Sequence, residues 1–496
     1  LVTPSSFMQF ILALFQVIGI LFLVLLVFNL IIVVHELGHF LAAKWRGLRI
    51  DKFQIWFGKA IWKKTIGGVQ YGLGSIPAGG FVALPQMAPM EMLEGSSDSE
   101  EPLPPISALD KIIVAFAGPL FSFGLAIFCA VVVWIAGTPE SRSSNSTTIG
   151  YILPGYPAAE AGLQPGDVVK AIDDQEVTTF GGMVDSIQWA VISSEKDTLD
   201  FDIERDGKPM SIEVEAEIPK DERPWYKKVF ARPPIRQVGL APQATPIFVG
   251  QTMEHSPAEI GGLEKKDQLL EMDGEKLYHF AQIGLHVEAN HPEQIEFKVL
   301  RGGEEKVVSV SPRIPENPGD YGEVKRVGLI TMSDELKPEQ FRDNVIIHPS
   351  PASQIKKTVR TMYNTLTAVA SPSSGISAAH LSGAPMIIYI YYKLFRNPDG
   401  WRLVLWFSVL LNVNLAILNL LPFPILDGGH ITMALIETIS RKPIDLRVLQ
   451  FMNASCAILL IGFMIFIAGF DFRDIFNDVT NKAKEPFQFE AVENAS

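Results

Sequence analysis

Four long apolar runs constrain the fold of this chain more than any other feature. They cover residues 7–34, 112–136, 403–421 and 454–470, whereas residues 138–343 have the mixed composition of a globular protein. A helix needs roughly 20 apolar residues to cross a hydrocarbon core about 30 Å thick. The runs therefore predict a polytopic α-helical membrane protein with four transmembrane helices, which we place, with their flanking residues, at 7–43, 111–136, 401–430 and 450–470.

Basic residues in the short loops predict the orientation of these helices, because lysine and arginine accumulate in cytoplasmic loops. They follow the first run at Lys44, Arg46, Arg49, Lys52, Lys59, Lys63 and Lys64, and precede the fourth at Arg441, Lys442 and Arg447. The two termini, the region between the second and third helices and a C-terminal tail at 471–496 should then face outward. The first run has no cationic leader and no small-residue cleavage site, which favours a retained helix over a signal peptide.

The globular region contains an internal repeat. Two segments, beginning at Gly150 and Gly250, align without a gap: GYILPGYPAAEAGLQPGDVVKAIDDQEV and GQTMEHSPAEIGGLEKKDQLLEMDGEKL. Such self-similarity predicts two modules of one architecture, which we place at 145–240 and 241–335. In the second module Lys266 stands where the first has Gly166, so we expect that turn to be altered. The modules either bind peptides or act only as spacers, and the residues leave both roles open.

Charge and cysteine content narrow the possible partners. The formal net charge of −13 argues against nucleic acid, because phosphate binding needs clustered positive charge. Cys129 and Cys456 both lie in apolar runs, so the outward region has no disulfide framework. Residues 349–396 combine helical apolar spacing with several tyrosines and predict helices at the membrane interface. Residues 91–105 are acidic and proline-containing and predict a surface loop.

The motif HELGH runs from His35 to His39, at one end of the first predicted transmembrane helix. In a helix its two histidines lie one turn apart on one face, and neutral imidazole is a good zinc ligand. Glu36 can take a proton from an attacking water and pass it to a leaving amine. The next charge is Lys44, so the histidines lie roughly 7 to 14 Å inward of it at about 1.5 Å per residue. Ionisable groups at that depth are costly and are usually functional.

A catalytic zinc site usually has three protein ligands, so a third residue is expected. The other polar cluster set into an apolar run is NLLPFPILDGGH, from Asn419 to His430. Its prolines break the helix, which a membrane tolerates where the freed backbone is buried in protein or lines a wet cavity. Asp427 and His430 are both acceptable ligands, and Asp427 is also a residue type common at helix caps. Residue chemistry alone leaves the third ligand open.

The HELGH motif, the duplicated modules and the pattern Asn-x-x-Pro-x-Pro-x-Leu-Asp-Gly together resemble the site-2 protease family, the M50-type intramembrane zinc metalloproteases. The likeness is greatest to its bacterial regulator-of-sigma-E protease branch and covers nearly the whole chain in order. It implies one zinc ion per chain, held by His35, His39 and Asp427. It also implies that Glu36 is the general base and acid.

The same resemblance implies a substrate class and a location. Members of the family cleave transmembrane segments of single-pass proteins, such as anti-sigma factors and signal peptide remnants, in regulated intramembrane proteolysis. Asn419 and the helix-breaking Pro422 and Pro424 would then bind the substrate. The two modules resemble α+β PDZ domains, which bind extended peptides at a sheet edge, and as a pair would act as a substrate size filter that also takes exported peptides. The expected location is the bacterial inner membrane, in contact with the lipid bilayer and with the active site near the cytoplasmic side.

Residues 44–110 resemble the cytoplasmic membrane-associated β-hairpin of the family, which could pair with an unwound substrate. Two positions depart from the family pattern. Trp56 stands where the family has the first glycine of a Gly-x-Gly motif, which puts close backbone approach there in doubt. Ser122 stands where relatives place asparagine, and we expect it to weaken a polar contact between helices.

Two other classes of function can be weighed against a protease. A membrane-anchored scaffold that binds peptides without catalysis would explain the modules but leaves HELGH and the Leu-Asp-Gly motif unexplained. A transporter is disfavoured, because four spans without an inverted repeat give little room for alternating access.

Overall fold

The structure of this 496-residue chain is a computed structural model. It describes residues 4–87, 106–221, 223–244, 246–317, 323–332, 343–441, 446–480 and 488–490. The acidic loop predicted at 91–105 lies outside these residues. The chain divides into two compact units, described in turn: one of residues 1–138, 347–363 and 381–476, and one of residues 139–346, 364–380 and 477–496.

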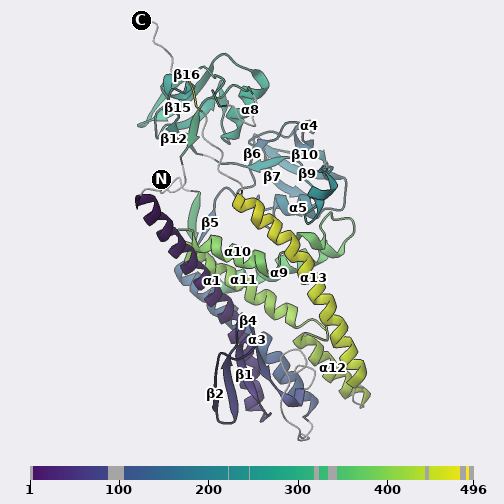
Figure 1. The fold of residues 1–496 in the computed structure, drawn as a ribbon. Coiled ribbons are helices and arrows are strands. Elements are labelled where there is room, and N and C mark those ends of the chain that lie inside the picture. Colours follow the sequence, from purple (N-terminus) through teal and green to yellow (C-terminus); the bar gives the residue numbers. More distant parts are fainter. Residues whose placement is uncertain are drawn as a thin grey trace. The chain divides into compact units, whose positions relative to one another are not determined.

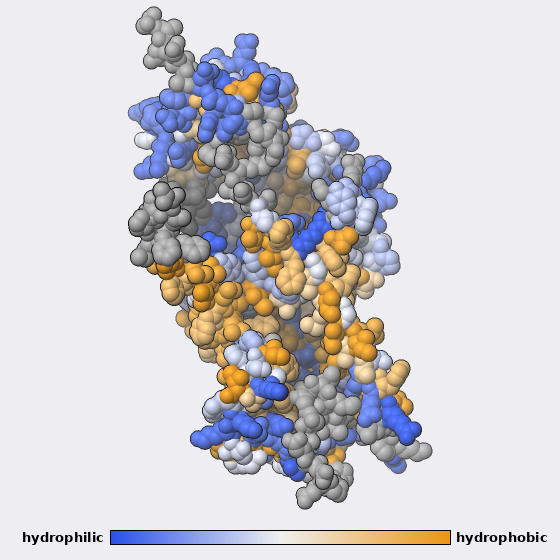
Figure 2. Space-filling view, viewed as in Figure 1, coloured by the Kyte–Doolittle hydropathy of each residue, from blue (hydrophilic) through white to orange (hydrophobic). Residues whose placement is uncertain are grey.

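Four helices are long and apolar enough to cross a membrane, as predicted. Within the described residues they are α1 (Pro4–Trp45), α3 (Ala108–Ala136), α11 (Gly400–Asn419) and α13 (Leu446–Thr480). Many of their large apolar side chains are exposed, such as Phe22 on α1 and Ile458 on α13. Figure 2 shows apolar side chains gathered over this part of the surface, which suits lipid as the solvent. Because α13 continues to Thr480, the tail predicted at 471–496 begins as helix.

The third predicted span, 401–430, is broken at its prolines, as expected from the sequence. α11 ends at Asn419, and α12 (Asp427–Ser440) begins after the break. Pro422 and Pro424 have no amide hydrogen with which to continue helical bonding. The chain between them turns back through backbone hydrogen bonds such as Phe423 N–H to the Leu421 carbonyl, 2.8 Å. The Leu-Asp-Gly motif therefore begins a helix rather than ending one.

The segment predicted as a β-hairpin is a four-stranded sheet instead. Its strands are β1 (Lys52–Phe57), β2 (Trp62–Ile66), β3 (Val69–Leu73) and β4 (Ile76–Ala83), in the order β2-β3-β1-β4. Gly67 and Gly68, both at positive φ, join β2 to β3, as a tight two-residue turn requires. β3 then pairs in parallel with β1, and β4 pairs antiparallel with β1 on its other side, which leaves β4 at an edge. The sheet lies at one end of α1 (Figure 1).

Close packing of α1 against α3 brings the HELGH motif near a second helix. A Cβ on Gly38 would lie 2.4 Å from the carbonyl oxygen of Ala117, so only glycine permits this approach. Small residues at helix crossings allow such contact in membranes, where van der Waals packing drives association. α3 also packs against α11 and α12.

The predicted interfacial segment 349–396 contains α9 (Pro351–Ala370) and α10 (Ala384–Phe395), joined through a short 3-10 turn, η5 (Ala378–His380). A second such turn, η1 (Pro85–Met87), follows β4.

The second unit contains two modules whose elements follow the same order, except that the first has an additional helix, α6 (Trp225–Lys228), with no counterpart in the described residues of the second. The first consists of β6 (Ile149–Ile152), α4 (Pro157–Glu160), β7 (Val168–Ile172), β8 (Gln175–Glu176), α5 (Ile187–Ser193), β9 (Thr198–Arg205), β10 (Lys208–Glu215), α6 (Trp225–Lys228) and β11 (Leu240–Pro242). The second consists of β12 (Ile247–Thr252), α7 (Pro257–Ile260), β13 (Gln268–Met272), β14 (Glu275–Lys276), α8 (Ala281–Asn290), β15 (Ile295–Arg301), β16 (Glu304–Val310) and β17 (Leu329–Thr331). A two-stranded pair, β5 (Thr138–Ser141) with β18 (Asn344–Ile347), brackets both modules in the sequence.

Each module repeats the same buried ion pair. Asp167 and Asp267, each 1% exposed, accept hydrogen bonds from Arg205 and Arg301 respectively. Each arginine also donates to the carbonyl of a glycine after the short helix. Lys266 adopts φ +79°, in the left-handed region where Gly166 has φ +99°. The expected alteration of that turn is therefore wrong, since lysine takes the glycine conformation.

Candidate metal centre

His35 and His39 project from one face of α1 into the interior of the helical unit. The two side chains are 10% and 2% exposed, and their Nε2 atoms lie 3.3 Å apart. This arrangement follows from the helical period alone, since residues four apart are neighbours on a helix surface. Two imidazole nitrogens at this separation form one side of a metal site.

Asp427, at the start of α12, supplies the third polar group. Its Oδ2 lies 3.3 Å from His35 Nε2, and its Oδ1 lies 3.4 Å from His39 Nε2. Zinc in tetrahedral sites binds such atoms at about 2.0–2.1 Å, which places the ligand atoms about 3.3 Å from each other. The two histidine nitrogens lie 3.3 Å apart, and each has one of the two Asp427 oxygens at a similar distance, so these residues fit a single zinc ion. Asp427 Oδ2 is buried without a hydrogen-bond partner, which a bound cation would supply.

The two other interpretations of this loop are not supported. His430 is buried, but the metal-sized cluster found among the described residues consists of His35, His39 and Asp427. Asp427 is not the cap of α12 either, because Leu426 occupies the N-cap position. Of the candidates the sequence left open, the carboxylate is the one that faces the histidines.

The remaining ring nitrogens of both histidines are held by α3. His35 Nδ1 lies 3.0 Å from Ser122 Oγ, and His39 Nδ1 lies 2.8 Å from the carbonyl oxygen of Val114. With Nδ1–H donating to these oxygens, each Nε2 keeps its lone pair directed at the centre. The weakening of a helix contact expected at Ser122 stays a prediction. Its fully buried hydroxyl lies against the ring of a candidate ligand.

Glycines permit the close approach of the surrounding backbone. A Cβ on Gly118 would lie 2.2 Å from His39 Nε2 and 2.9 Å from His35 Cε1. A Cβ on Gly428 would lie 2.2 Å from the Leu420 carbonyl oxygen, and one on Gly429 2.1 Å from that of Phe423. Gly118 and Val114 had no signal in the sequence, because their role depends on how α3 crosses α1, and Ser122 was noticed only as a departure from the family pattern.

Glu36 lies beside the edge strand β4. The amide of Val82 is a hydrogen-bond donor to the Glu36 carboxylate, and a Cβ on Gly80 would lie 3.6 Å from Glu36 Cγ. Glu36 Oε2 is buried and has no hydrogen-bond partner. A carboxylate with an unpaired buried oxygen, next to two imidazoles that could hold a metal ion, suits proton transfer rather than a structural ion pair.

The predicted substrate residues lie at the break between α11 and α12. Asn419, the last residue of α11, places Nδ2 3.5 Å from His35 Nε2. Pro422 and Pro424 stand within the break, where the Pro424 backbone borders Gly429. Asn419 thus lies beside the candidate metal ligands, whereas the two prolines lie in the loop that leads to Asp427.

Two imidazoles, a carboxylate and an adjacent glutamate, set among helices of membrane-spanning length, define a membrane metalloprotease of the HExxH type. A family model agrees: the chain belongs to peptidase family M50, whose model matches residues 21–463. The chain is therefore a zinc metalloprotease.

Its relatives include the regulator of sigma-E protease RseP of Escherichia coli strain K12, 28% identical over 457 residues, covering 88% of this chain and 94% of the relative. The regulator of sigma E protease of Haemophilus influenzae is 28% identical over 449 residues, covering 88% and 95%. A putative zinc metalloprotease of Neisseria meningitidis, NMA0084, is 28% identical over 467 residues, covering 92% and 98%.

Proposed function

We propose that this chain is an intramembrane endopeptidase that hydrolyses peptide bonds in the transmembrane segments of single-pass proteins. The observation that carries the proposal is the position of the ligand triangle, on α1 and α12 within the apolar helical unit. A helix with large exposed apolar side chains on its other faces would be unfavourable in a protease that is surrounded by water. An HExxH motif buried in such a helix is therefore typical of a membrane site. The printed names of its relatives support a role in the regulation of a sigma-E type pathway. We propose anti-sigma factors and signal peptide remnants as the substrates.

In this proposal each residue has a distinct task. His35, His39 and Asp427 would hold the zinc ion, which would supply Lewis-acid activation of the scissile carbonyl and of a water. Glu36 accepts the proton of the attacking water and returns it to the leaving amine. Asn419 donates a hydrogen bond to the developing oxyanion, beside the His35 ring.

We assign the presentation of the substrate to β4. A peptide bond in a helix has its backbone groups already paired, so the helix must unwind before cleavage and its hydrogen bonds must be replaced. β4 is an edge strand of the sheet and passes beside Glu36, near Gly80 and Val82. An extended substrate paired to this edge would bring its carbonyl to the metal centre.

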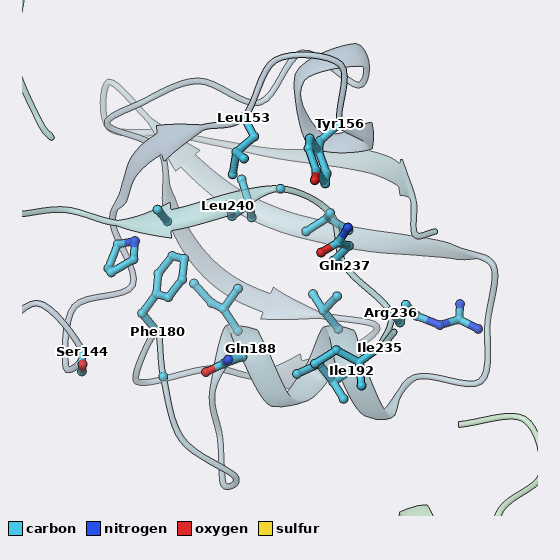
Figure 3. A pocket seen from close by; sticks show the side chains of 17 residues that line it. Ser144, Leu153, Tyr156, Phe180, Gln188, Ile192, Ile235, Arg236, Gln237 and Leu240 are labelled. Atoms are coloured by element: carbon cyan, nitrogen blue, oxygen red, sulfur yellow. The ribbon is translucent and has the colours of Figure 1, made fainter. Parts of the chain in front are cut away.

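The two modules are proposed to be PDZ-like domains that filter substrates by size and bind exported peptides. The first has a cavity of about 450 Å³ between the segment ending in β11 and the helix α5. Figure 3 shows Leu240 on one side of this cavity and Gln188 and Ile192 on the other. The second has a cavity of about 230 Å³, lined in part by Gly284 and Leu329. An extended peptide added between strand and helix would fit such grooves.

The proposed topology places the chain in the bacterial inner membrane. The basic loops after α1 and before α13 are cytoplasmic, and the two termini and the modules are outside the cytoplasm. The active site is then near the cytoplasmic side.

Substitution of Glu36 by glutamine tests the proposal. The purified Glu36→Gln protein should retain zinc, because the ligands are untouched, and should not cleave a transmembrane substrate that the native protein cleaves. Mass spectrometry of membrane-peptide fragments, compared between the two proteins, would identify the scissile bond. Undiminished cleavage by Glu36→Gln would overturn the assigned base, and absence of bound zinc in both proteins would favour a peptide-binding scaffold.

A further inference from the structure

An aromatic ring covers the start of the β11 strand in the first module. Gly239 has φ +82°, and a Cβ there would lie 2.3 Å from the Cβ of Tyr156 and 2.6 Å from its Cγ. Tyr156 immediately precedes α4. Tyr156 is thus a residue of the module itself. Its side chain fills the space beside Gly239, which has no side chain of its own.

The second module lacks this ring. Ser256 occupies the position that Tyr156 holds in the gapless alignment, and Gly328, at φ +74°, corresponds to Gly239. A Cβ on Gly328 would lie 2.4 Å from the Cβ of Ser256 and 2.7 Å from a ring carbon of Phe489. Phe489, from the C-terminal segment, thus lies beside Gly328, as Tyr156 lies beside Gly239 in the first module.

Polar contacts hold the residues on both sides of Phe489. The amide of Glu316 donates to the Gln488 carbonyl, 2.8 Å, and the amide of Gln488 donates to Asn317 Oδ1, 2.6 Å. Phe489 is 6% exposed, whereas Gln488 and Glu490 are exposed. Phe489 points inward between two residues that point outward, and the backbone of Gln488 is hydrogen-bonded through both its amide and its carbonyl group. This is the pattern of a peptide bound in extended form.

We propose that the second module is a binding surface for the C-terminal segment of this same chain, anchored by Phe489. The ring fills the site that Ser256 leaves open, and an aromatic side chain is the type that contributes most area to such contacts. Because the segment is covalently attached, its effective concentration at the module is high, and a modest intrinsic affinity suffices to keep it bound. The first module has no need of such a segment, since Tyr156 already occupies the corresponding place.

Hydrogen exchange of the full-length protein in detergent, followed by mass spectrometry, tests this proposal. In Phe489→Ala we expect loss of protection at residues 313–317 and 488–490. Phe472→Ala is the control, because Phe472 is 63% exposed on α13, and it should leave both segments as in the native protein. Native-like protection of 313–317 in Phe489→Ala would overturn the proposal. The measurement requires no cleavage, so it is independent of the proposed protease activity.

A second variant restores the ring from within the module. Ser256→Tyr, built on the pattern of the first module, should displace the C-terminal segment and increase exchange at 488–490. A Ser256→Tyr protein that keeps 488–490 fully protected would show that Phe489 does not occupy the ring site, which would refute the assignment.

Discussion

Trp56 Nε1 donates a hydrogen bond to Asn29 Oδ1 over 2.5 Å and so joins the end of β1 to α1. Trp56 adopts φ +69°, a region in which bulky residues are rare. The buried Gln54 side chain donates to the carbonyls of Trp56 and Gly58 and stabilises the turn from inside. Where relatives are expected to have glycine, this chain uses a tryptophan as an anchor between the sheet and the helix that carries the HELGH motif.

Trp56→Phe keeps a ring and removes the donor. The hydrogen bond contributes about 1 kcal/mol net, and Asn29 would keep an unpaired oxygen in apolar surroundings. We expect β1, and with it β4, to be held less firmly beside Glu36, so that cleavage of a transmembrane substrate falls about fivefold while zinc content is unchanged. Trp62→Phe, on the exposed strand β2, should cleave at the native rate. Equal rates for both variants would show that the anchor has no part in positioning the sheet.

Gly118→Ala should abolish zinc binding. The added methyl would stand 2.2 Å from His39 Nε2, so either the ring or α3 must move. Gly124→Ala on the same helix meets nothing within 4 Å and is the matched control. Metal analysis of the two purified proteins should find zinc in the control alone, and zinc retained in Gly118→Ala at the native ratio would contradict the ligand geometry.

Ser122→Ala should weaken zinc binding without removing a ligand. His35 Nδ1 would lose its oxygen partner, and loss of such orienting contacts commonly reduces metal affinity by roughly 10–100-fold. Ser408→Ala is the control, because Ser408 is equally a buried serine of a membrane helix but bonds Tyr391. Titration with a competing chelator should separate the two variants, and identical zinc affinities would refute the orienting role.

Asp427→Ala should lose zinc and activity together, whereas His430→Gln should keep both. Asp427 has oxygens 3.3 and 3.4 Å from the two histidine nitrogens, and His430 stands outside the metal-sized cluster. Chelation of the native protein should stop cleavage, and added zinc should restore it. If His430→Gln lost zinc and Asp427→Ala kept it, the third ligand would have to be reassigned.

Local periodicity and helix breaks were enough to predict much of this site. His35 and His39 lie on one helix face because they are four residues apart, and the prolines before Asp427 marked a broken helix that carries a candidate ligand. Ser122 and Gly118 could not be predicted as partners of the histidines, because their contacts depend on the crossing of two helices far apart in sequence. The four-stranded sheet was missed for a similar reason. β1 and β3 pair in parallel although β2 lies between them in the sequence, and an alternating pattern does not reveal such pairing.

The depth of the HELGH motif also bears on how cleaved substrate departs. Hydrolysis turns one neutral peptide bond into a carboxylate and an ammonium group, each costly by a few kcal/mol near a bilayer centre. From the histidines, the level of Lys44 is only about 7 to 14 Å away along α1, so a fragment released toward that side reaches water within a few helical turns. The fragment on the opposite side must carry its new charge past a longer apolar path. Release of products is therefore directional, and the fragment on the Lys44 side should leave first.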